Sequence, residues 1–209
     1  MRTVLCFGDS ILWGYNAADQ SRFPWEERWS GVLASRLGAG CRVVEEGLCG
    51  RTTMVDPPFL DGRSAKALYP LLLETHSPVD AVLIMLGTND LQPVLRLTVE
   101  EIAWGCAGLL RTTALSRFGP GGAPPRTMLI TPPPLGELKG AMASAFVGRE
   151  ADSRRLHAVY APVASMFGAA SFDAGTVCSA GISDGVHPDQ AGHLALGRAL
   201  EAPVRALLE

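Results

Sequence analysis

Short apolar runs alternate with amphipathic segments along the chain, and this alternation constrains its fold more than any other feature. The runs are mostly apolar on both faces, as in a parallel sheet that helices cover on both sides. Strands that alternate with helices form right-handed crossovers, so the pattern predicts an α/β fold with one doubly wound sheet. The predicted strands are Thr3–Phe7, Arg42–Glu46, Ala81–Leu86, Thr127–Thr131 and Ser171–Asp173.

Segments with helical spacing of apolar residues lie between and after these strands. The segment over residues 98–115 begins with a capping box, in which Thr98 and Glu101 satisfy each other's backbone N–H groups. Proline has no amide hydrogen, so Pro162 should kink or break the helix predicted over Glu150–Phe167, and Pro203 should interrupt the last predicted helix. The predicted helices are Arg28–Leu37, Thr98–Leu115, Glu150–Phe167 and one that begins near Pro188-Asp189.

Length and composition bound the class of protein. The 209 residues suit one domain spanning 1–209, and 47% hydrophobic residues allow a large core. The net charge of -3 and the lack of a basic cluster argue against a nucleic-acid partner. Five scattered cysteines form neither a metal-type pair nor a disulfide framework, which predicts no metal site and a reducing, cytoplasmic location. No apolar run approaches the length of a membrane helix, so we expect no membrane association.

A serine directly follows the first predicted strand, in the sequence Gly8-Asp9-Ser10. In an open α/β sheet, ligands bind at the edge where the strands have their carboxyl ends. A serine hydroxyl becomes a nucleophile when a base takes its proton, another group orients that base, and donors stabilise the oxyanion. Gly-Asp-Ser is also ordinary turn chemistry, so the triplet alone leaves a purely structural role open.

Three later segments can supply what this serine needs. Asp184 lies three residues before His187, so a tight loop can bring its carboxylate to Nδ1 and leave Nε2 free for Ser10. Asn89 offers an amide NH2 after the third strand, and Gly50 offers a backbone N–H after the second. Each segment alone also fits a turn or a helix cap. Because each follows a different strand, we predict that they meet in one crevice.

These segments resemble the four sequence blocks of the SGNH hydrolases, also called GDSL esterases, and the flanking residues resemble the bacterial arylesterase branch. The resemblance implies a flavodoxin-like, three-layer α/β/α fold with a five-stranded parallel sheet. It spans nearly the whole chain. It rests on Cys6–Ser10, Glu45–Leu48, Gly50–Thr53, Met85–Asp90, Pro132–Leu135, Phe172–Gly175 and the pair Asp184 and His187.

The resemblance also implies an activity, a serine esterase that hydrolyses short-chain or aryl esters through an acyl-enzyme. It makes Ser10 the nucleophile, His187 the base and Asp184 the group that orients the base. The backbone N–H groups of Ser10 and Gly50, with the side chain of Asn89, would form the oxyanion hole. A small-molecule ester would donate the acyl group to water, an alcohol or a peroxide, so acyltransferase or perhydrolase activity is implied too, without a cofactor. Members of this branch are often oligomers, including octamers, which implies a homo-oligomer.

The residues around and after Ser10 are expected to decide which ester reaches it. Ile11-Leu12 departs from the polar second residue of many relatives, and we expect this to alter the pocket beside the nucleophile. Two long irregular stretches, Thr53–Ser64 and Pro132–Gly148, follow strands at the same edge and are typical of binding loops or lids. Asp9 is also well placed to cap the first helix. The predicted substrate-pocket residues are Asp9, Ile11, Leu12 and Trp13.

Two other functions stay open at this point. A carbohydrate O-acetyl esterase would use the same serine, histidine and aspartate. A non-catalytic, flavodoxin-like ligand-binding module would need a phosphate-binding loop, but the sequence has neither a G-x-G-x-x-G nor a Walker pattern. Three other histidines compete with His187, and we expect structural or surface roles for them because none has an aspartate at the required edge. They are His76, His157 and His193.

Overall fold

Five parallel strands form one sheet at the centre of the molecule, in the order β2-β1-β3-β4-β5. The computed structural model describes all residues, 1–209. The order reverses between β2 and β3, as in a doubly wound sheet, so the predicted α/β fold is confirmed. Every predicted strand is present, with ends that differ by at most a residue. The strands are β1 Arg2–Gly8, β2 Cys41–Gly47, β3 Ala81–Met85, β4 Arg126–Thr131 and β5 Ala170–Asp173.

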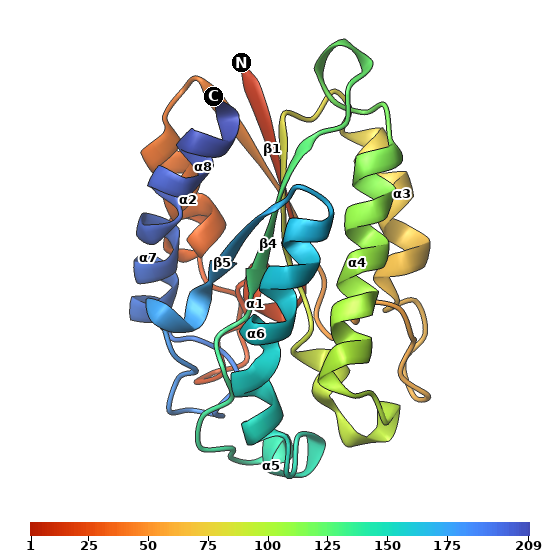
Figure 1. Cartoon of the computed structure of the whole chain (residues 1–209). Coiled ribbons are helices and arrows are strands. Elements are labelled where there is room, and N and C mark those ends of the chain that lie inside the picture. The colour runs from red at the N-terminus through yellow and green to blue at the C-terminus, as the bar shows by residue number, and fades with distance from the viewer.

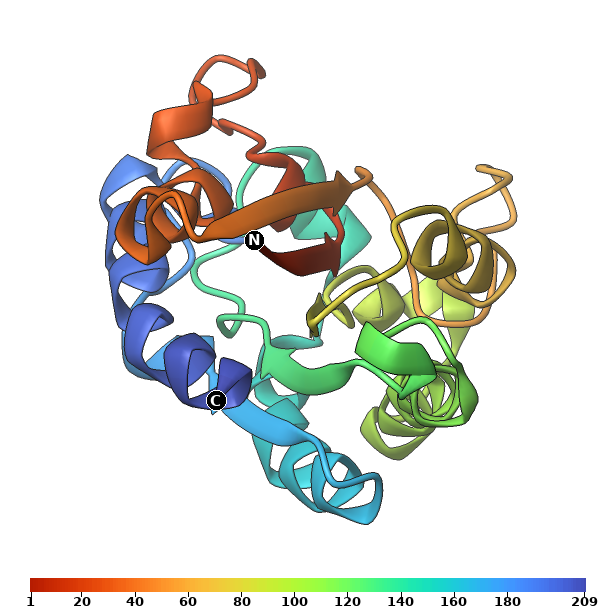
Figure 2. The same ribbon diagram turned by 90° about the horizontal axis from the view of Figure 1, so that it is seen from above.

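Helices cover both faces of this sheet and complete three layers (Figures 1 and 2). One layer contains α1 Ser10–Trp13, α2 Trp29–Leu37, α7 Gln190–Ala199 and α8 Glu201–Leu208, and the other contains α3 Ala65–Thr75, α4 Val99–Leu115 and α6 Glu150–Met166. The short helix α5, Ala141–Ala145, lies at the end of the molecule opposite both termini (Figure 1). Short 3-10 turns cover Trp25–Glu27, Asn89–Leu91, Pro93–Leu95, Pro120–Gly122 and Ala174–Thr176.

Two apolar clusters, one on each face, hold the three layers together. Alternate residues of a strand point to opposite faces. In β1, Leu5 and Phe7 accordingly belong to the cluster under α3, α4 and α6, whereas Val4 and Cys6 belong to the cluster under α1, α2, α7 and α8. Burial of both faces explains why the strands read as continuous apolar runs in the sequence.

One of the two expectations about proline was wrong. Helix α6 runs through Pro162 without a break. Pro162 and Ala158, whose carbonyl loses its helical partner, both face solvent, so water can hydrogen-bond that carbonyl. The interruption of the last helix is present as expected: α7 ends at Ala199 and α8 begins at Glu201, with Pro203 in the first turn of α8, where a backbone N–H has no helical acceptor in any case.

Two helices were not among those predicted. Helix α3 contains Pro70, which weakened its helical signal, although Ala65, Tyr69 and Leu73 form a buried stripe along it. Helix α5 has five residues and lies inside the stretch Pro132–Gly148, which we expected to be irregular. The capping box at Thr98 and Glu101 is present as predicted.

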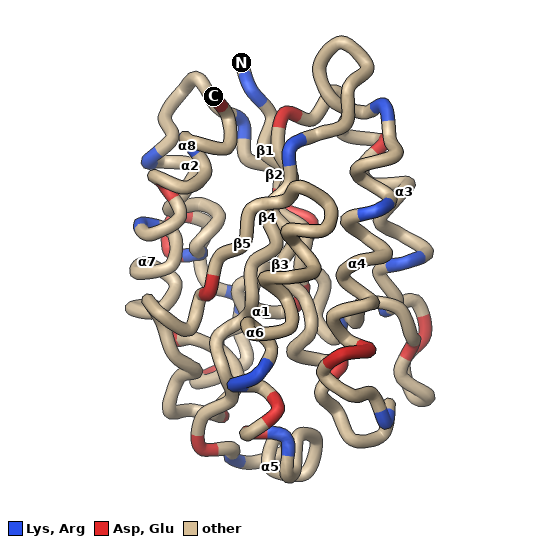
Figure 3. The backbone as a smooth tube through the Cα atoms, viewed as in Figure 1, with Lys and Arg blue, Asp and Glu red and all other residues tan.

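Charged side chains of both signs are interspersed over the face of the molecule seen in Figure 3. Neither sign dominates any part of this view, in keeping with the small net charge of -3. None of the helices combines the length and the hydropathy that a bilayer crossing requires.

The imidazole of His193 is buried between α7 and α2. Its side chain is 0% exposed, its Nδ1 accepts a hydrogen bond of 3.3 Å from the backbone N–H of Trp29, and its ring packs edge-on against Phe23. Burial is the main reason why the pKa of His193 is lowered to about 4. The neutral imidazole is therefore part of the core, in agreement with the structural role expected for it.

We predict that His193 makes the protein less stable as the pH falls from about 6.5 to 4. Over that range the unfolded chain binds a proton that the folded chain does not, because the pKa is about 4 when folded and 6.5 in the reference state. His193→Asn should remove up to roughly 3 kcal/mol of this pH dependence. Urea unfolding at pH 7 and pH 4.5 measures it, with His157→Asn as the control for loss of an imidazole. Equal pH dependence in His193→Asn and wild type would contradict the prediction.

Candidate active site

The carboxyl edge of the sheet brings together the side chains that the sequence placed after separate strands. The Ser10 hydroxyl lies 2.8 Å from His187 Nε2, and His187 Nδ1 lies 2.6 Å from Asp184 Oδ2. Asn89 and Gly50 line the same cavity as Ser10 and His187. The three side chains form a hydrogen-bonded series from carboxylate through imidazole to hydroxyl.

Ser10 owes its position to the abrupt change from β1 to α1. Gly8 ends the strand, and a Cβ there would lie 2.8 Å from the carbonyl oxygen of Met85 and 2.9 Å from Cβ of Leu12, so only glycine fits. Asp9 caps α1 by accepting a hydrogen bond of 2.9 Å from the backbone N–H of Ile11. Ser10 therefore begins the helix, and its hydroxyl faces the sheet edge beside His187.

The loop that carries Asp184 and His187 is folded around the aspartate side chain. Asp184 Oδ1 accepts hydrogen bonds from the backbone N–H groups of Val186 and His187, at 2.8 and 3.0 Å, which leaves Oδ2 for the imidazole. Gly185 has φ 77°, and a Cβ there would lie 2.2 Å from the carbonyl oxygen of Glu137, so the tight turn requires glycine.

Asp184 is held in its ionised form. Partial burial acts to raise its pKa, but the hydrogen bonds from the side chain and backbone of His187 and from the backbone of Val186 outweigh burial, so the net pKa is lowered. An ionised Asp184 accepts the Nδ1–H of His187. It thereby fixes the tautomer in which Nε2 can accept the proton of Ser10.

Gly50 and Asn89 face the space in front of Ser10. Gly50 has φ 78°, a conformation that favours glycine, and it contributes to the cavity lining. Asn89 Nδ2 donates a hydrogen bond of 3.0 Å to the carbonyl oxygen of Arg51, and its Oδ1 accepts from Gln92 Nε2 at 3.4 Å. The orientation of the Asn89 amide is thus set on both sides, with its NH2 group toward the sheet edge.

Buried charged side chains make hydrogen bonds that connect the loops at this edge of the sheet. The Arg51 guanidinium lies 4.2 Å from the centre of the Phe7 ring and donates a hydrogen bond of 2.7 Å to the carbonyl oxygen of Gly8. Asp90 accepts hydrogen bonds from the backbone N–H and the hydroxyl of Thr53, at 2.9 and 2.6 Å. Burial raises the pKa of Asp90 to about 6, and it does the same for Asp9.

A cavity of about 240 Å³ opens in front of Ser10. Its lining is mostly apolar away from the hydroxyl and the imidazole. Three of its residues come from the stretch Pro132–Gly148, which therefore does contribute to the pocket, as its length suggested. Most of the residues that line this cavity were not predicted from the sequence, because apolar residues in loops give no periodic signal. The lining residues are Ser10, Tyr15, Cys49, Gly50, Asn89, Gln92, Met142, Ala145, Phe146, Val186 and His187.

The structure corrects the prediction that Asp9, Ile11, Leu12 and Trp13 line the substrate pocket, since none of the four contributes to this cavity. Ile11 and Leu12 are at most 1% exposed and pack in the core with α2, because the first turn of α1 points them into the molecule. Asp9 is turned toward the helix cap, and the ring of Trp13 lies against the guanidinium of Arg22. The stretch Thr53–Ser64 does not line the cavity either.

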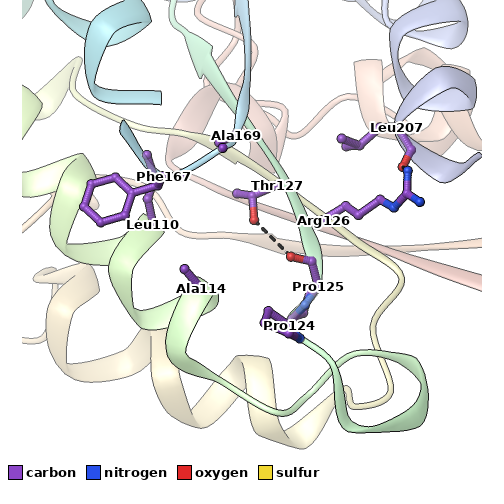
Figure 4. Close-up of a pocket in the computed structure, with 10 residues that line it drawn as sticks. Leu110, Ala114, Pro124, Pro125, Arg126, Thr127, Phe167, Ala169 and Leu207 are labelled. Atoms are coloured by element: carbon purple, nitrogen blue, oxygen red, sulfur yellow. Dashed lines mark hydrogen bonds between the residues drawn. The ribbon is translucent and has the colours of Figure 1, made fainter. Parts of the chain in front are cut away.

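The other histidines lie away from this series of hydrogen bonds. His76 Nε2 lies 2.7 Å from Glu46, and His157 Nδ1 lies 3.0 Å from the hydroxyl of Thr131. A larger cavity of about 420 Å³ lies at the opposite end of the sheet (Figure 4). In it, Arg126 reaches the carbonyl oxygen of Leu207 and Thr127 hydrogen-bonds Pro125, so its polar groups serve to tie the chain together.

The fold and the series Ser10, His187 and Asp184 define the class of serine hydrolases. A model of the GDSL-like lipase/acylhydrolase family matches residues 6–195, and the chain belongs to this family. Its activity is therefore the hydrolysis of ester bonds, and the sequence resemblance to SGNH hydrolases is confirmed.

Solved structures agree over the full length of the chain. The native aryl esterase of M. smegmatis is 39% identical, with 100% of both chains covered and a TM-score of 0.94. Est24, a carbohydrate acetylesterase from Sinorhizobium meliloti, is 36% identical, with 99% of this chain and 100% of that chain covered and a TM-score of 0.94. A comparison with curated proteins returns no match.

Proposed function

We propose that this chain cleaves short-chain or aryl carboxylic esters, with Ser10 as nucleophile, His187 as general base and Asp184 as the group that orients the base. The observation that carries the proposal is the series of hydrogen bonds from Asp184 through His187 to Ser10, at 2.6 and 2.8 Å, on the wall of an apolar cavity. Both distances suit proton transfer through the imidazole.

The reaction follows from the atoms at this edge. Ser10 Oγ attacks the ester carbonyl carbon while its proton passes to His187 Nε2, and the carbonyl oxygen becomes an oxyanion. The backbone N–H groups of Ser10 and Gly50 and the Asn89 amide stabilise that oxyanion. The oxyanion collapses, the alcohol leaves with the proton from His187, and the acyl group stays on Ser10. Water, activated by the same imidazole, then releases the acid and restores Ser10.

We also propose that an alcohol or a peroxide can replace water in the second half of the reaction. Support comes from the cavity wall, where Met142, Ala145, Phe146 and Val186 leave few partners for water beside Ser10. An alcohol or a peroxide that carries an apolar substituent gains from burial against such side chains, whereas water does not. Acyl transfer and perhydrolysis would then use the same acyl-enzyme as hydrolysis.

A carbohydrate O-acetyl esterase is the second candidate, favoured by the similarity to Est24. Both functions use the same three catalytic residues. The difference lies in the leaving group, because a sugar needs several hydrogen-bonding partners whereas an aryl alcohol needs apolar contacts. The apolar wall of the cavity supports the aryl ester as the better substrate.

We infer three further properties of the whole molecule. One sheet with a core on each face supports a single domain over residues 1–209. All five cysteines are free, which supports a reducing, cytoplasmic location. Large exposed apolar side chains on α3 and α4, including Leu71, Trp104 and Leu115, support a homo-oligomer, as the resemblance implied.

We predict that Ser10→Ala abolishes hydrolysis of p-nitrophenyl acetate and leaves the fold intact, because the change removes one oxygen from a side chain that is only 7% exposed. A phosphonate inhibitor should add covalently to Ser10 in wild type, as peptide mass spectrometry can show. Ser165→Ala, on the exposed face of α6, is the matched control. Undiminished turnover by Ser10→Ala, or a phosphonate on another residue, would refute the assignment of the nucleophile.

We predict that Asn89→Ala and Asn89→Asp each lower kcat by about 10²–10³, because each removes one donor to the oxyanion. KM should change little, since the ground-state carbonyl carries less charge than the oxyanion. Steady-state kinetics with p-nitrophenyl acetate provide both constants. A rise in KM at unchanged kcat would instead make Asn89 a residue that only holds the substrate.

We predict a higher kcat/KM for phenyl acetate than for an acetylated monosaccharide, because the phenyl group fits the apolar wall of the cavity. Longer linear acyl chains on the same alcohol should lower kcat/KM once they exceed the space of about 240 Å³. Hydrolysis rates for both series, measured by acid release at constant pH, test this. Faster release from the acetylated sugar would establish the second candidate function.

A further inference from the structure

The ring of Tyr15 lies against the imidazole of His187. The ring centres are 4.6 Å apart and the planes meet at 53°, a tilted contact between two aromatic rings. Tyr15 also lines the cavity, and its backbone N–H donates a hydrogen bond of 3.0 Å to the carbonyl oxygen of Ser10. It therefore touches the general base of the proposed mechanism and is tied to the residue that carries the nucleophile.

The imidazole needs such a contact because its other restraints change during the reaction. Rotation of a histidine ring about its Cβ–Cγ bond is only weakly restricted by intrinsic preference. In the free enzyme, Asp184 holds one ring nitrogen and Ser10 the other. In the acyl-enzyme Ser10 Oγ is part of an ester and has no proton to donate to Nε2. Asp184 and the packing against Tyr15 then hold the ring while it activates water.

The position of Tyr15 is set by the segment of residues 14–28, which connects α1 to α2. Within this segment Tyr15 forms an antiparallel bridge with Arg22. Arg22 Nη2 lies 2.6 Å from Glu45 Oε2, and its Nε donates a hydrogen bond of 2.7 Å to the carbonyl oxygen of Trp13. The residue that pairs with Tyr15 is thus bound to a carboxylate of the sheet.

Glu45 holds this segment at its middle, through Arg22, and at its end, through Arg28. It lies on β2 with a side chain only 7% exposed, and it accepts hydrogen bonds from Arg28 at 2.5 Å and from the Ser30 hydroxyl at 2.6 Å. Arg28 also donates to the carbonyl oxygen of Phe23. Two cations and a hydroxyl converge on one carboxylate, and together they fasten the segment to β2.

We propose that Tyr15 is a positioning residue for His187 and that Glu45, through Arg22, holds Tyr15 in place. The proposal rests on the proposed function, because it assigns His187 the role of general base. It implies that loss of the Tyr15 ring slows deacylation more than acylation, since the hydroxyl of Ser10 helps to hold the imidazole only before the acyl group is attached.

Pre-steady-state kinetics with p-nitrophenyl acetate separate the two half-reactions. We expect Tyr15→Ala to slow deacylation by roughly three- to tenfold, the range that corresponds to one aromatic contact, with a smaller effect on acylation. The burst of p-nitrophenol should grow, and kcat and KM should fall together, because acyl-enzyme accumulates. Tyr15→Phe keeps the ring and should restore the deacylation rate that Tyr15→Ala loses.

Glu45→Gln tests the second part, because it removes the charge and keeps the size of the side chain. Glu45→Gln should also slow deacylation, but by a smaller factor than Tyr15→Ala does. In the double variant with Tyr15→Ala, the loss should be smaller than the product of the two single losses, since both act on the same ring. Glu46→Gln is the matched control, because the neighbouring carboxylate binds His76 instead.

The outcomes distinguish the proposal from the function on which it rests. If wild type forms an acyl-enzyme on Ser10 but Tyr15→Ala slows both half-reactions equally, or only raises KM, Tyr15 is a cavity wall and the proposal is wrong. If Glu45→Gln and Tyr15→Ala give fully independent losses, the role of Glu45 is wrong. If wild type forms no acyl-enzyme on Ser10, the proposed function fails first and the proposal with it.

Discussion

Parallel pairing of five strands between two apolar layers is the constraint on which the rest of the structure depends. Because the strands all run in one direction, every strand ends at the same edge, and the loops that follow them meet there. Ser10, Gly50 and Asn89 follow β1, β2 and β3, which are neighbours in the sheet. The strand ends thus bring together residues that lie far apart in sequence, and hydrogen bonds between the loops, such as the one from Asn89 Nδ2 to the carbonyl oxygen of Arg51, connect them there.

Much of this arrangement is predictable from the sequence, because burial on both faces leaves a clear apolar signal in every strand. Ser10, Asp184 and His187 are predictable too, because their spacing and their positions after strands indicate which groups can meet. The effect of Pro162 was misjudged because the local rule ignores exposure: Pro162 faces solvent, where the freed carbonyl costs little. Once a helix starts at Ser10, the next two side chains turn inward, so proximity in sequence to Ser10 does not place a residue in the cavity.

The cavity wall is the part that local sequence patterns could not supply. Met142, Ala145 and Phe146 come from a short helix in a long loop, and Tyr15 comes from the segment after α1. Their place depends on long-range contacts, such as the hydrogen bonds of 2.8 and 3.1 Å that join the backbone of Gly136 and Lys139 to the loop of Asp184. Such contacts leave no periodic pattern within either segment, so only the folded chain reveals them.

The site therefore consists of two parts, one that holds the groups proposed to react and one that encloses the ester. Strand ends, the start of α1 and the hydrogen-bonded turn at Asp184 hold the groups that we propose to react. The ester is enclosed by loops that the sheet does not build. The segment of residues 14–28 belongs to both parts, since Tyr15 contacts the imidazole and the cavity while Glu45 fastens the segment to β2. A substitution of Tyr15 would consequently change both the cavity wall and the packing of the imidazole.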